Sequence, residues 1–386
     1  MSLEECFSGA APSLGAASVL VVGAGVSGLT TALLLRKAGA RVTIVADRFA
    51  PQVTSVVAGA LWEWPPAVCG SHHDPTSLAR SKNWSALSYR IFTSLSKKCA
   101  AGVFLRPVTF YFREKIETVP LEFKKMNEFS GKVLEFRHDP RLIEENGVNP
   151  SRLRDAYRFL APMVDTDVYM RWLSEEVRLA GVTFVQERIT QPLLECEDEL
   201  KYRYRADWII NCSGLGSREL ARDNVYPLRG ALVRLRNNIN LREAHCVSHD
   251  IRDSDPYFIF ILPRGENRVL AGGIAEENEW DTNLPLDHAR VREMWRRCVE
   301  FFPALAKAEI DEEEPVRTGL RPLRPGNVRL EAESDSTIIH NYGHGGSGVT
   351  FSWGCAREIV ERLSGKQNFT VPAFQRFEGV AAVARP

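Results

Sequence analysis

The sequence predicts an α/β protein in which a second, antiparallel sheet is inserted into a domain built from both ends of the chain. Three observations support this prediction. A short apolar run, Ser18–Val22, meets three closely spaced glycines and leads at once into an apolar helical pattern. Several β-branched and aromatic segments follow one another between residues 229 and 273, which is typical of antiparallel strands. Over residues 337–363 a strand, a glycine-rich turn and a helix occur again.

The glycines at the N-terminus have the spacing of a dinucleotide-binding turn, Gly-x-Gly-x-x-Gly, between a strand and a helix. Gly23 would allow the tight turn, Gly25 would let the backbone approach a pyrophosphate, and Gly28 would let helix and strand pack closely. The helix N-terminus would then offer unpaired N–H groups to the phosphates. Arg41–Ala46 is the next predicted strand, and Asp47 follows it where a carboxylate can accept a hydrogen bond from a ribose hydroxyl. We therefore predict a Rossmann-type domain with a bound dinucleotide; the alternative is a glycine-rich turn without a ligand.

The other elements follow from local patterns. Asp165 and its neighbours Thr166 and Asp167 are good N-terminal caps for a helix that Gly181 ends. Ala206–Gly216 is an apolar strand that ends in small residues, and such an end can lie against a dinucleotide because larger side chains would block it. We expect helices at 77–101, 165–179, 287–302 and 349–363. We expect further strands at 103–117, 182–186, 206–216, 229–236, 245–249, 257–262, 268–273 and 337–340.

The order of these patterns predicts a division into two domains. The nucleotide-binding domain is expected to be discontinuous and to comprise residues 18–75, 155–225 and 315–365. The substrate domain is expected to comprise residues 76–154 and 226–314.

Composition excludes several classes of function. The 386 residues include 49 basic and 49 acidic side chains, so nothing favours nucleic acid or an anionic membrane surface as a partner. No apolar run has the length of a membrane span, and the acidic Glu4 and Glu5 do not suit a signal peptide. The eight cysteines are scattered, so we expect free thiols in a reducing, cytoplasmic location and no metal site. His72, His73 and Asp74 are expected to form a solvated loop.

Several blocks of the sequence, in order over residues 18–365, resemble the D-amino acid oxidases and the wider group of glycine and sarcosine oxidases, which are FAD-dependent amine oxidases. The most specific blocks lie near the C-terminus, and the D-amino acid oxidase branch is the most similar. The matching blocks are 21–29, 46–49, 58–62, 164–169 with Trp172 and Leu173, 211–214, 229–230, 272–273, 318–325, 340–348 and 353–356.

The resemblance implies a non-covalently bound FAD whose flavin ring lies between the nucleotide domain and the antiparallel sheet. Asp47 would take the adenosine ribose with Arg48 beside it, the turn at 23–28 would take the pyrophosphate, and the start of the last helix would face the flavin C2 carbonyl, where negative charge develops on reduction. The residues expected to bind FAD are Gly23, Gly25, Val26, Ser27, Gly28, Asp47, Arg48, Thr54, Ser55, Ala58, Gly59, Cys212, Ser213, Gly214, Gly345, Gly346, Gly348, Val349 and Thr350.

The same resemblance assigns the substrate carboxylate to Arg321, whose guanidinium suits a two-point grip. The alternative is that Arg321 forms a structural salt bridge; Arg317 and Arg324 are expected to do so. The carbonyl oxygen of Gly346 would accept from the substrate amine.

The sequence departs from the family pattern at the pocket wall. Phe260 and Pro256 stand where the D-amino acid oxidases have tyrosines. The adjacent Tyr257 is a further candidate for binding the substrate, although strand alternation predicts that it faces away from Phe258 and Phe260 unless a bulge intervenes. The pocket is therefore expected to be apolar, with a bulky or N-substituted substrate. Trp62, Trp64, Phe258 and Phe260 are candidates to line it, and packing in an ordinary core is the alternative for these rings.

These residues imply an oxidase of the C–N bond of an amino acid that transfers hydride to flavin N5 and reduces O2 to hydrogen peroxide. No catalytic acid or base is expected, because hydride transfer requires orientation and a dry site; His344 is expected to form structural hydrogen bonds. The alternatives are a glycine-oxidase-like cleavage of an N-substituted glycine that releases glyoxylate, an amine dehydrogenase that passes electrons to a partner, and a non-catalytic module that binds FAD or NAD. The expected partners are a small amino acid or N-substituted glycine and O2, and the resemblance allows a homodimer.

Overall fold

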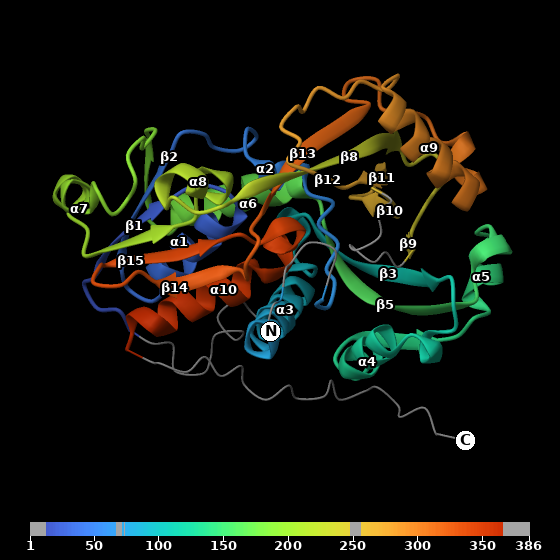
Figure 1. Cartoon of the computed structure of the whole chain (residues 1–386), viewed down its shortest axis with the longest axis horizontal. Coiled ribbons are helices and arrows are strands. Elements are labelled where there is room, and N and C mark those ends of the chain that lie inside the picture. Colours follow the sequence, from blue (N-terminus) through green and yellow to red (C-terminus); the bar gives the residue numbers. More distant parts are fainter. Residues whose placement is uncertain (1–12, 67–71, 73, 248–255, 366–386) are drawn as a thin grey trace.

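The computed structural model describes residues 13–66, 72, 74–247 and 256–365. Two sheets lie side by side along the long axis of the molecule, and the long strands β8 and β13 reach the middle, where the two meet (Figure 1). Sheet A, toward the left of that view, contains the first and the last strand of the described chain. Sheet B lies toward the right with α9 above it.

Sheet A confirms the predicted Rossmann-type arrangement. Its strand order is β14-β15-β7-β1-β2-β6, and all neighbours are parallel except the antiparallel pair β14–β15. A central strand with a crossover on either side places the ends of β1 and β7 at one edge, where ligands bind in such sheets. The strands are β1 (Ser18–Val22), β2 (Arg41–Ala46), β6 (Thr183–Gln186), β7 (Trp208–Asn211), β14 (Arg329–Ala332) and β15 (Ile338–Tyr342).

Alternation along these strands gives sheet A two apolar faces. Val19 and Val21 face a cluster that includes residues of α1, α3, α6 and α10, whereas Leu20 and Val22 face a smaller cluster with residues of α7 and α8. The helices are α1 (Val26–Lys37), α2 (Thr54–Val57), α3 (Pro75–Leu95), α6 (Thr166–Leu179), α7 (Glu197–Tyr204), α8 (Ser217–Leu220) and α10 (Gly348–Leu363).

Sheet B has nine strands in the order β12-β8-β11-β10-β9-β3-β5-β4, with β13 paired to β8. Most pairs are antiparallel, as the sequence predicts, but β3 and β9 run parallel. The strands are β3 (Val103–Phe112), β4 (Leu134–His138), β5 (Asp155–Val164), β8 (Tyr226–Arg236), β9 (Ala244–Val247), β10 (Tyr257–Arg264), β11 (Arg268–Ile274), β12 (Glu276–Glu277) and β13 (Val316–Leu323); the helices that pack beside them are α4 (Pro120–Phe129), α5 (Leu142–Glu145) and α9 (Ala289–Phe301).

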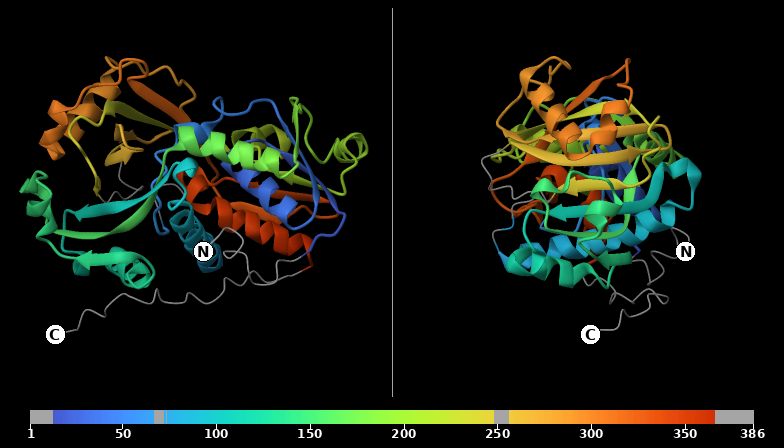
Figure 2. Two further views of the ribbon diagram at one scale, coloured as in Figure 1. Left: turned by 180° about the vertical axis from the view of Figure 1, so that it is seen from behind. Right: turned by 90° about the vertical axis from the view of Figure 1, so that its right-hand side faces the viewer.

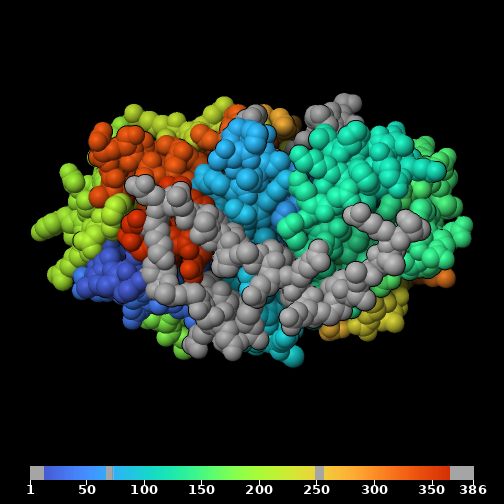
Figure 3. All heavy atoms as spheres, turned by 90° about the horizontal axis from the view of Figure 1, so that it is seen from below, coloured from blue at the N-terminus to red at the C-terminus, as the bar shows by residue number. Residues whose placement is uncertain are grey.

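The structure shifts several boundaries that the sequence predicts. Two strands assigned to the nucleotide domain, β5 and β13, pair within sheet B. Conversely, α3 was assigned to the substrate domain, but its Trp84, Leu87 and Ile91 pack in the cluster that also contains α1 and α10. Figure 2 shows the two sheets from behind and from the end, and Figure 3 shows α3 between α10 and the residues around α4. The two-domain division remains a proposal, and the sheets place its boundaries differently at these three elements.

Membrane-spanning helices and metal-binding groups can be assessed only in the described part of the chain. In the residues that the structure describes, no helix is long and apolar enough to cross a membrane, and no group of three histidine, cysteine or acidic side chains could hold a metal ion. Six cysteines in this part are free thiols. His73, Cys6, Cys69 and the predicted strand residues 248–249 lie outside the described residues.

Candidate active site

The turn between β1 and α1 explains why two of its three glycines cannot carry side chains. Gly23 has a φ of 108°, and a Cβ there would lie 2.5 Å from the carbonyl oxygen of Cys212, at the end of β7. A Cβ on Gly28 would lie 2.0 Å from the carbonyl oxygen of Gly23. A Cβ on Gly25 would meet only the Ser55 hydroxyl, at 3.2 Å. Gly23 and Gly28 therefore serve backbone packing, and Gly25 leaves space in front of the helix.

The N-terminus of α1 is prepared for an anion. Its N-cap, Gly25, has no side chain to cap the helix, and the first turn has no acidic residue. The Val26 N–H donates to the Ser55 hydroxyl at 2.9 Å, so this segment of α2 stands directly beside the helix N-terminus. Unpaired N–H groups and the positive end of the helix dipole favour a phosphate at this position.

Asp47 and Arg48 follow β2 at the same edge of sheet A. The Arg48 Nε lies 3.3 Å from a carboxylate oxygen of Asp47, and the two side chains are 67% and 47% exposed. The Asp47 carboxylate is therefore accessible to a hydroxyl donor.

The segment 54–59, which comprises α2 and the two residues after it and carries Thr54, Ser55, Ala58 and Gly59, is held by its backbone carbonyls. The Val56 carbonyl accepts from the Thr166 hydroxyl at 2.6 Å and from an Arg317 nitrogen at 3.2 Å. The Ala58 carbonyl accepts from Arg264 at 2.5 Å, and Arg264 also donates to the Val164 carbonyl and, at 3.1 Å, to the Thr166 hydroxyl. We call this group, Arg264, Thr166 and Arg317, the loop clamp. Burial lowers the pKa of Arg264 to about 10, which still leaves it charged at neutral pH.

The end of β7 and the C-terminal turn complete this edge of sheet A. Burial raises the pKa of the Cys212 thiol to about 12, so the thiol stays protonated at neutral pH. Gly345 has a φ of 54°, and α10 begins at Gly348 with neither a capping side chain nor an acidic residue in its first turn. His344 is buried and lies 3.0 Å from the amide oxygen of Asn341, in the structural role that the sequence predicts.

Arg321 of β13 differs from the neighbouring arginines, Arg317 and Arg324. Arg317 pairs with Asp167 and Glu314, and Arg324 pairs with Asp223. Within the described residues, the half-buried Arg321 guanidinium has no carboxylate partner; one nitrogen donates to the Ile274 carbonyl at 3.1 Å. Gly230 lies beneath it, since a Cβ there would be 2.4 Å from two guanidinium nitrogens.

Two phenyl rings of β10 connect Arg321 with the loop after α2. The Arg321 guanidinium lies 5.9 Å from the Phe258 ring, and the Phe258 and Phe260 ring centroids are 6.3 Å apart. The Phe260 ring packs on Gly59, where a Cβ would lie 2.4 Å from it. The structure therefore brings Arg321, Phe258, Phe260 and Gly59 into one row.

Two other predicted substrate residues lie elsewhere. The register of β10 shifts between Tyr257 and Phe260, yet Tyr257 packs against the cluster that contains α9 and stands 4.5 Å from the Arg297 guanidinium. Trp62 is 3% exposed and donates its indole N–H to the Ser85 carbonyl, and its ring centroid lies 4.7 Å from that of Tyr89. Trp64 is also buried in this aromatic core.

The model of the DAO family, described as FAD dependent oxidoreductase, matches residues 18–362. The chain belongs to this family. It is 35% identical to the D-amino-acid oxidase of Rubrobacter xylanophilus over 349 residues, which cover 89% of this chain and 95% of that protein. It is 30% identical to the D-aspartate oxidase of Homo sapiens, covering 90% and 95% of the two chains.

Solved structures of two other oxidases have a similar fold. The glycine oxidase of Geobacillus kaustophilus superposes with a TM-score of 0.72 at 16% identity, over 94% of this chain and 99% of that one. The FAD-bound L-α-glycerophosphate oxidase of Mycoplasma pneumoniae gives 0.70 at 16% identity, over 90% and 94%.

The residues of this DAO-family protein fit its cofactor, FAD. Gly25 leaves room in front of α1, the N-cap residues of α1 and α10 make no capping hydrogen bond through a side chain, and Asp47 is open to a hydroxyl group. These groups would hold the pyrophosphate, the flavin carbonyl edge and the ribose. The sequence did not predict that Arg264 and Thr166 donate hydrogen bonds to the segment 54–59, because these bonds join parts of the chain that are far apart in the sequence.

Proposed function

We propose that this FAD-dependent oxidoreductase is an oxidase of the C–N bond of an amino acid, of the D-amino acid type. The observation that carries the proposal is Arg321, a half-buried guanidinium without a carboxylate partner in the described part of the chain, which faces an aromatic wall. A guanidinium pairs with a carboxylate through two parallel hydrogen bonds, so a substrate carboxylate satisfies it. The identity to D-amino-acid oxidases supports the same substrate class.

The protein's own residues would orient the substrate. Arg321 would hold the carboxylate, and the Gly346 carbonyl would accept a hydrogen bond from the amine, so that the substrate carbon is fixed in position. FAD, when bound, supplies the acceptor for two electrons. The substrate carbon loses a hydride and the nitrogen loses a proton, which leaves an imine; water then converts the imine to a keto acid and ammonia. O2 with two electrons and two protons becomes hydrogen peroxide.

The apolar wall favours a larger substrate. Phe260 presents a plain ring at the position where the resemblance expects a tyrosine, and the Phe258 ring lies 6.3 Å from it. We therefore propose that the side chain or the amine substituent is bulky and apolar. The same observation supports a second candidate, oxidation of an N-substituted glycine to glyoxylate and an amine. The cytoplasmic location, the homodimer and the choice of O2 over a protein electron acceptor remain predictions.

A peroxide-release screen tests the proposal. The substrates are D-amino acids, L-amino acids, glycine, sarcosine and longer N-alkyl glycines, each assayed with the holoprotein. Release of peroxide with D-amino acids supports the first candidate, and release only with N-alkyl glycines supports the second. Reduction of the bound flavin without peroxide would indicate a dehydrogenase, and no reduction by any substrate would leave a non-catalytic FAD-binding module.

Arg321→Leu tests the anchor. We expect kcat/KM to fall by roughly a hundredfold or more while FAD stays bound, because a buried charge pair with the carboxylate is lost. Arg321→Lys should restore part of the activity, since an ammonium cannot reproduce the two-point grip. Arg188→Leu, which removes an exposed arginine, is the control. Unchanged kinetics in Arg321→Leu would remove this residue from the site.

A further inference from the structure

A cavity of about 390 Å³ lies beside α9, outside the site described above. Its wall combines the end of β3, the short helical turn Pro150–Arg152, the start of β10 and the second half of α9. Phe258 lies between the two sites, since it lines this cavity and also faces Arg321. The proposed oxidase reaction uses none of the polar side chains of this cavity.

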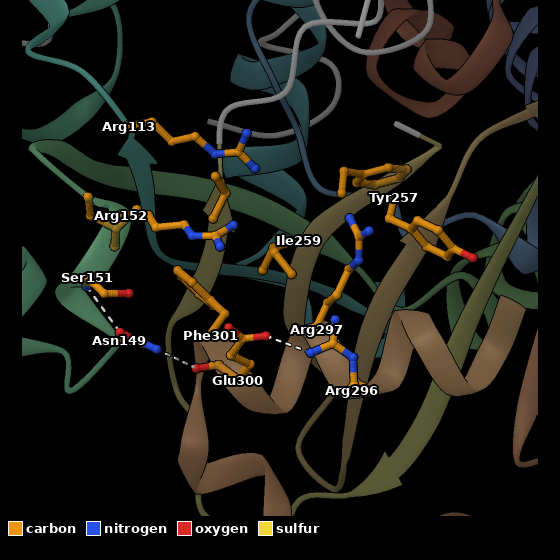
Figure 4. A pocket seen from close by; sticks show the side chains of 13 residues that line it. Arg113, Asn149, Ser151, Arg152, Tyr257, Ile259, Arg296, Arg297, Glu300 and Phe301 are labelled. Atoms are coloured by element: carbon orange, nitrogen blue, oxygen red, sulfur yellow. Dashed lines mark hydrogen bonds and ion pairs between the residues drawn. The ribbon is translucent and has the colours of Figure 1, made fainter. Parts of the chain in front are cut away.

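Four arginines line this cavity, and they come from three separate parts of the chain. Figure 4 shows Arg113, after β3, and Arg152, in the short helical turn, side by side and opposite Arg297 of α9. The acidic side chains of α9 are already engaged: Glu293 pairs with Arg296 and Arg297, and Glu300 pairs with Arg296. These hydrogen bonds lower the pKa of Glu293 to about 2, so it remains an anion committed to its own helix.

The positive charges of Arg113 and Arg152 are not paired in this way. No ion pair joins either guanidinium to a carboxylate among the residues that the structure describes. Two positive charges that point into one cavity repel each other, and a negatively charged ligand between them removes that repulsion. Two planar guanidinium forks also match the oxygen atoms of a phosphate or of two carboxylates.

One part of the wall is apolar, and Asn149, Ser151 and Glu300 add polar groups to the rest of it. Leu153, Ile259 and Phe301 line the cavity, and Leu153 and Phe301 are 7% and 8% exposed, so they form part of the packed domain. Such a wall suits a hydrocarbon or aromatic body next to the charged end of a ligand.

We propose that this cavity is a binding site for a small organic dianion with an apolar body, such as an aryl phosphate or a dicarboxylate. Arg113 and Arg152 bind the charged end, and Leu153, Ile259 and Phe301 contact the body. The site is separate from the carboxylate anchor at Arg321, so its occupancy does not depend on the proposed oxidase activity.

The test measures binding of phenyl phosphate to the full-length holoprotein by isothermal titration calorimetry at fixed ionic strength. We expect one saturable site in the parent and at least a tenfold weaker affinity in Arg113→Gln/Arg152→Gln. The control is Arg236→Gln/Arg242→Gln, which removes the same charge from two exposed arginines outside the cavity. Benzyl alcohol, which has the ring without the charge, is the control ligand.

Three results would overturn the proposal. The first is no saturable binding of phenyl phosphate to the parent. The second is an equal loss of affinity in both double variants, which would indicate only a general effect of charge. The third is equally tight binding of benzyl alcohol, which would show that the arginines do not contribute. Circular dichroism of both double variants establishes that each is folded before its affinity is compared.

Discussion

At the scale of single residues, Phe260 has the clearest consequence for substrate choice. Its ring packs on Gly59 and stands 6.3 Å from Phe258. Phe260→Tyr should improve the use of small D-amino acids such as D-alanine, because a hydrogen bond to a charged group contributes roughly 1.5–3 kcal/mol, or about ten- to a hundredfold in kcat/KM. Steady-state kinetics measure the gain, and Phe123→Tyr makes the same change on a ring that is 38% exposed. Parent-like kinetics with every substrate would place Phe260 in the ordinary core.

A second residue, His344, links stability to pH. Burial lowers its pKa from 6.5 to about 4. Between these pH values the unfolded chain binds a proton that the folded protein does not, so stability is complete above about pH 6.5 and falls as the pH drops toward 4. The loss is at most roughly 3 kcal/mol, from 1.36 kcal/mol for each pKa unit. Urea unfolding at pH 7 and pH 4.5 should show this loss, and His344→Gln should reduce it. Identical pH dependence in parent and variant would exclude His344 as the cause.

At the scale of elements, the turn between β1 and α1 contains one glycine that is needed for FAD binding, Gly25, and another that is needed for folding, Gly28. A side chain on Gly25 meets only the Ser55 hydroxyl, whereas one on Gly28 collides with the Gly23 carbonyl at 2.0 Å. Gly25→Val should therefore fold but purify without FAD, since the side chain occupies the space of the pyrophosphate. Gly28→Val should fail to fold. Circular dichroism and flavin absorbance distinguish the two outcomes, and a full complement of flavin in Gly25→Val would contradict the placement of the cofactor.

The elements also show where a single sequence stops being informative. Helix α6 was predicted to within one residue because Asp165 caps it, its side chain accepting from the Asp167 N–H. The sheet to which β5 and β13 belong was not predicted, since their partners, β3 and β8, lie 50 or more residues away along most of the register. Tyr257 was predicted to face away from Phe260 by alternation, and its packing against the α9 cluster agrees. Local pattern thus determines an element, and pairing between distant segments determines its place.

At the scale of the whole molecule, family membership makes the chain an FAD-dependent oxidoreductase, and the fold alone does not determine the substrate. A glycine oxidase and a glycerophosphate oxidase share this fold at 16% identity, so the architecture is compatible with different substrates. What is particular to this chain lies where the two sheets meet, at Arg321, Phe258 and Phe260. The sequence names all three as candidate site residues: Arg321 and Phe260 by their positions in the family pattern, and Phe258 as an aromatic neighbour of Phe260. It does not predict the loop clamp, which depends on three segments meeting in space.

The loop clamp connects the two sheets through the segment 54–59, and this connection leads to a prediction for the whole molecule. Arg264 belongs to sheet B, yet it donates to the Ala58 carbonyl and to Thr166 at the start of α6. Arg264→Met leaves the partly buried Ala58 carbonyl without this donor, so the segment 54–59, which carries Thr54 and Ser55, loses its fixed position. We expect FAD to dissociate at least about tenfold more readily, which corresponds to roughly 1.4 kcal/mol.

The measurement is a titration of apoprotein with FAD, followed by tryptophan fluorescence. Arg242→Met, on an arginine that is 61% exposed, should bind FAD like the parent, and Thr166→Val should weaken FAD in the same direction as Arg264→Met. The two changes together should weaken FAD by less than the product of their separate effects, since both act on one network. One result would contradict this prediction: Arg264→Met lowers the melting temperature of the apoprotein but leaves the FAD affinity within about twofold of the parent. A twofold change amounts to only ~0.4 kcal/mol. The arginine would then contribute to the packing of the domains and would not position the cofactor.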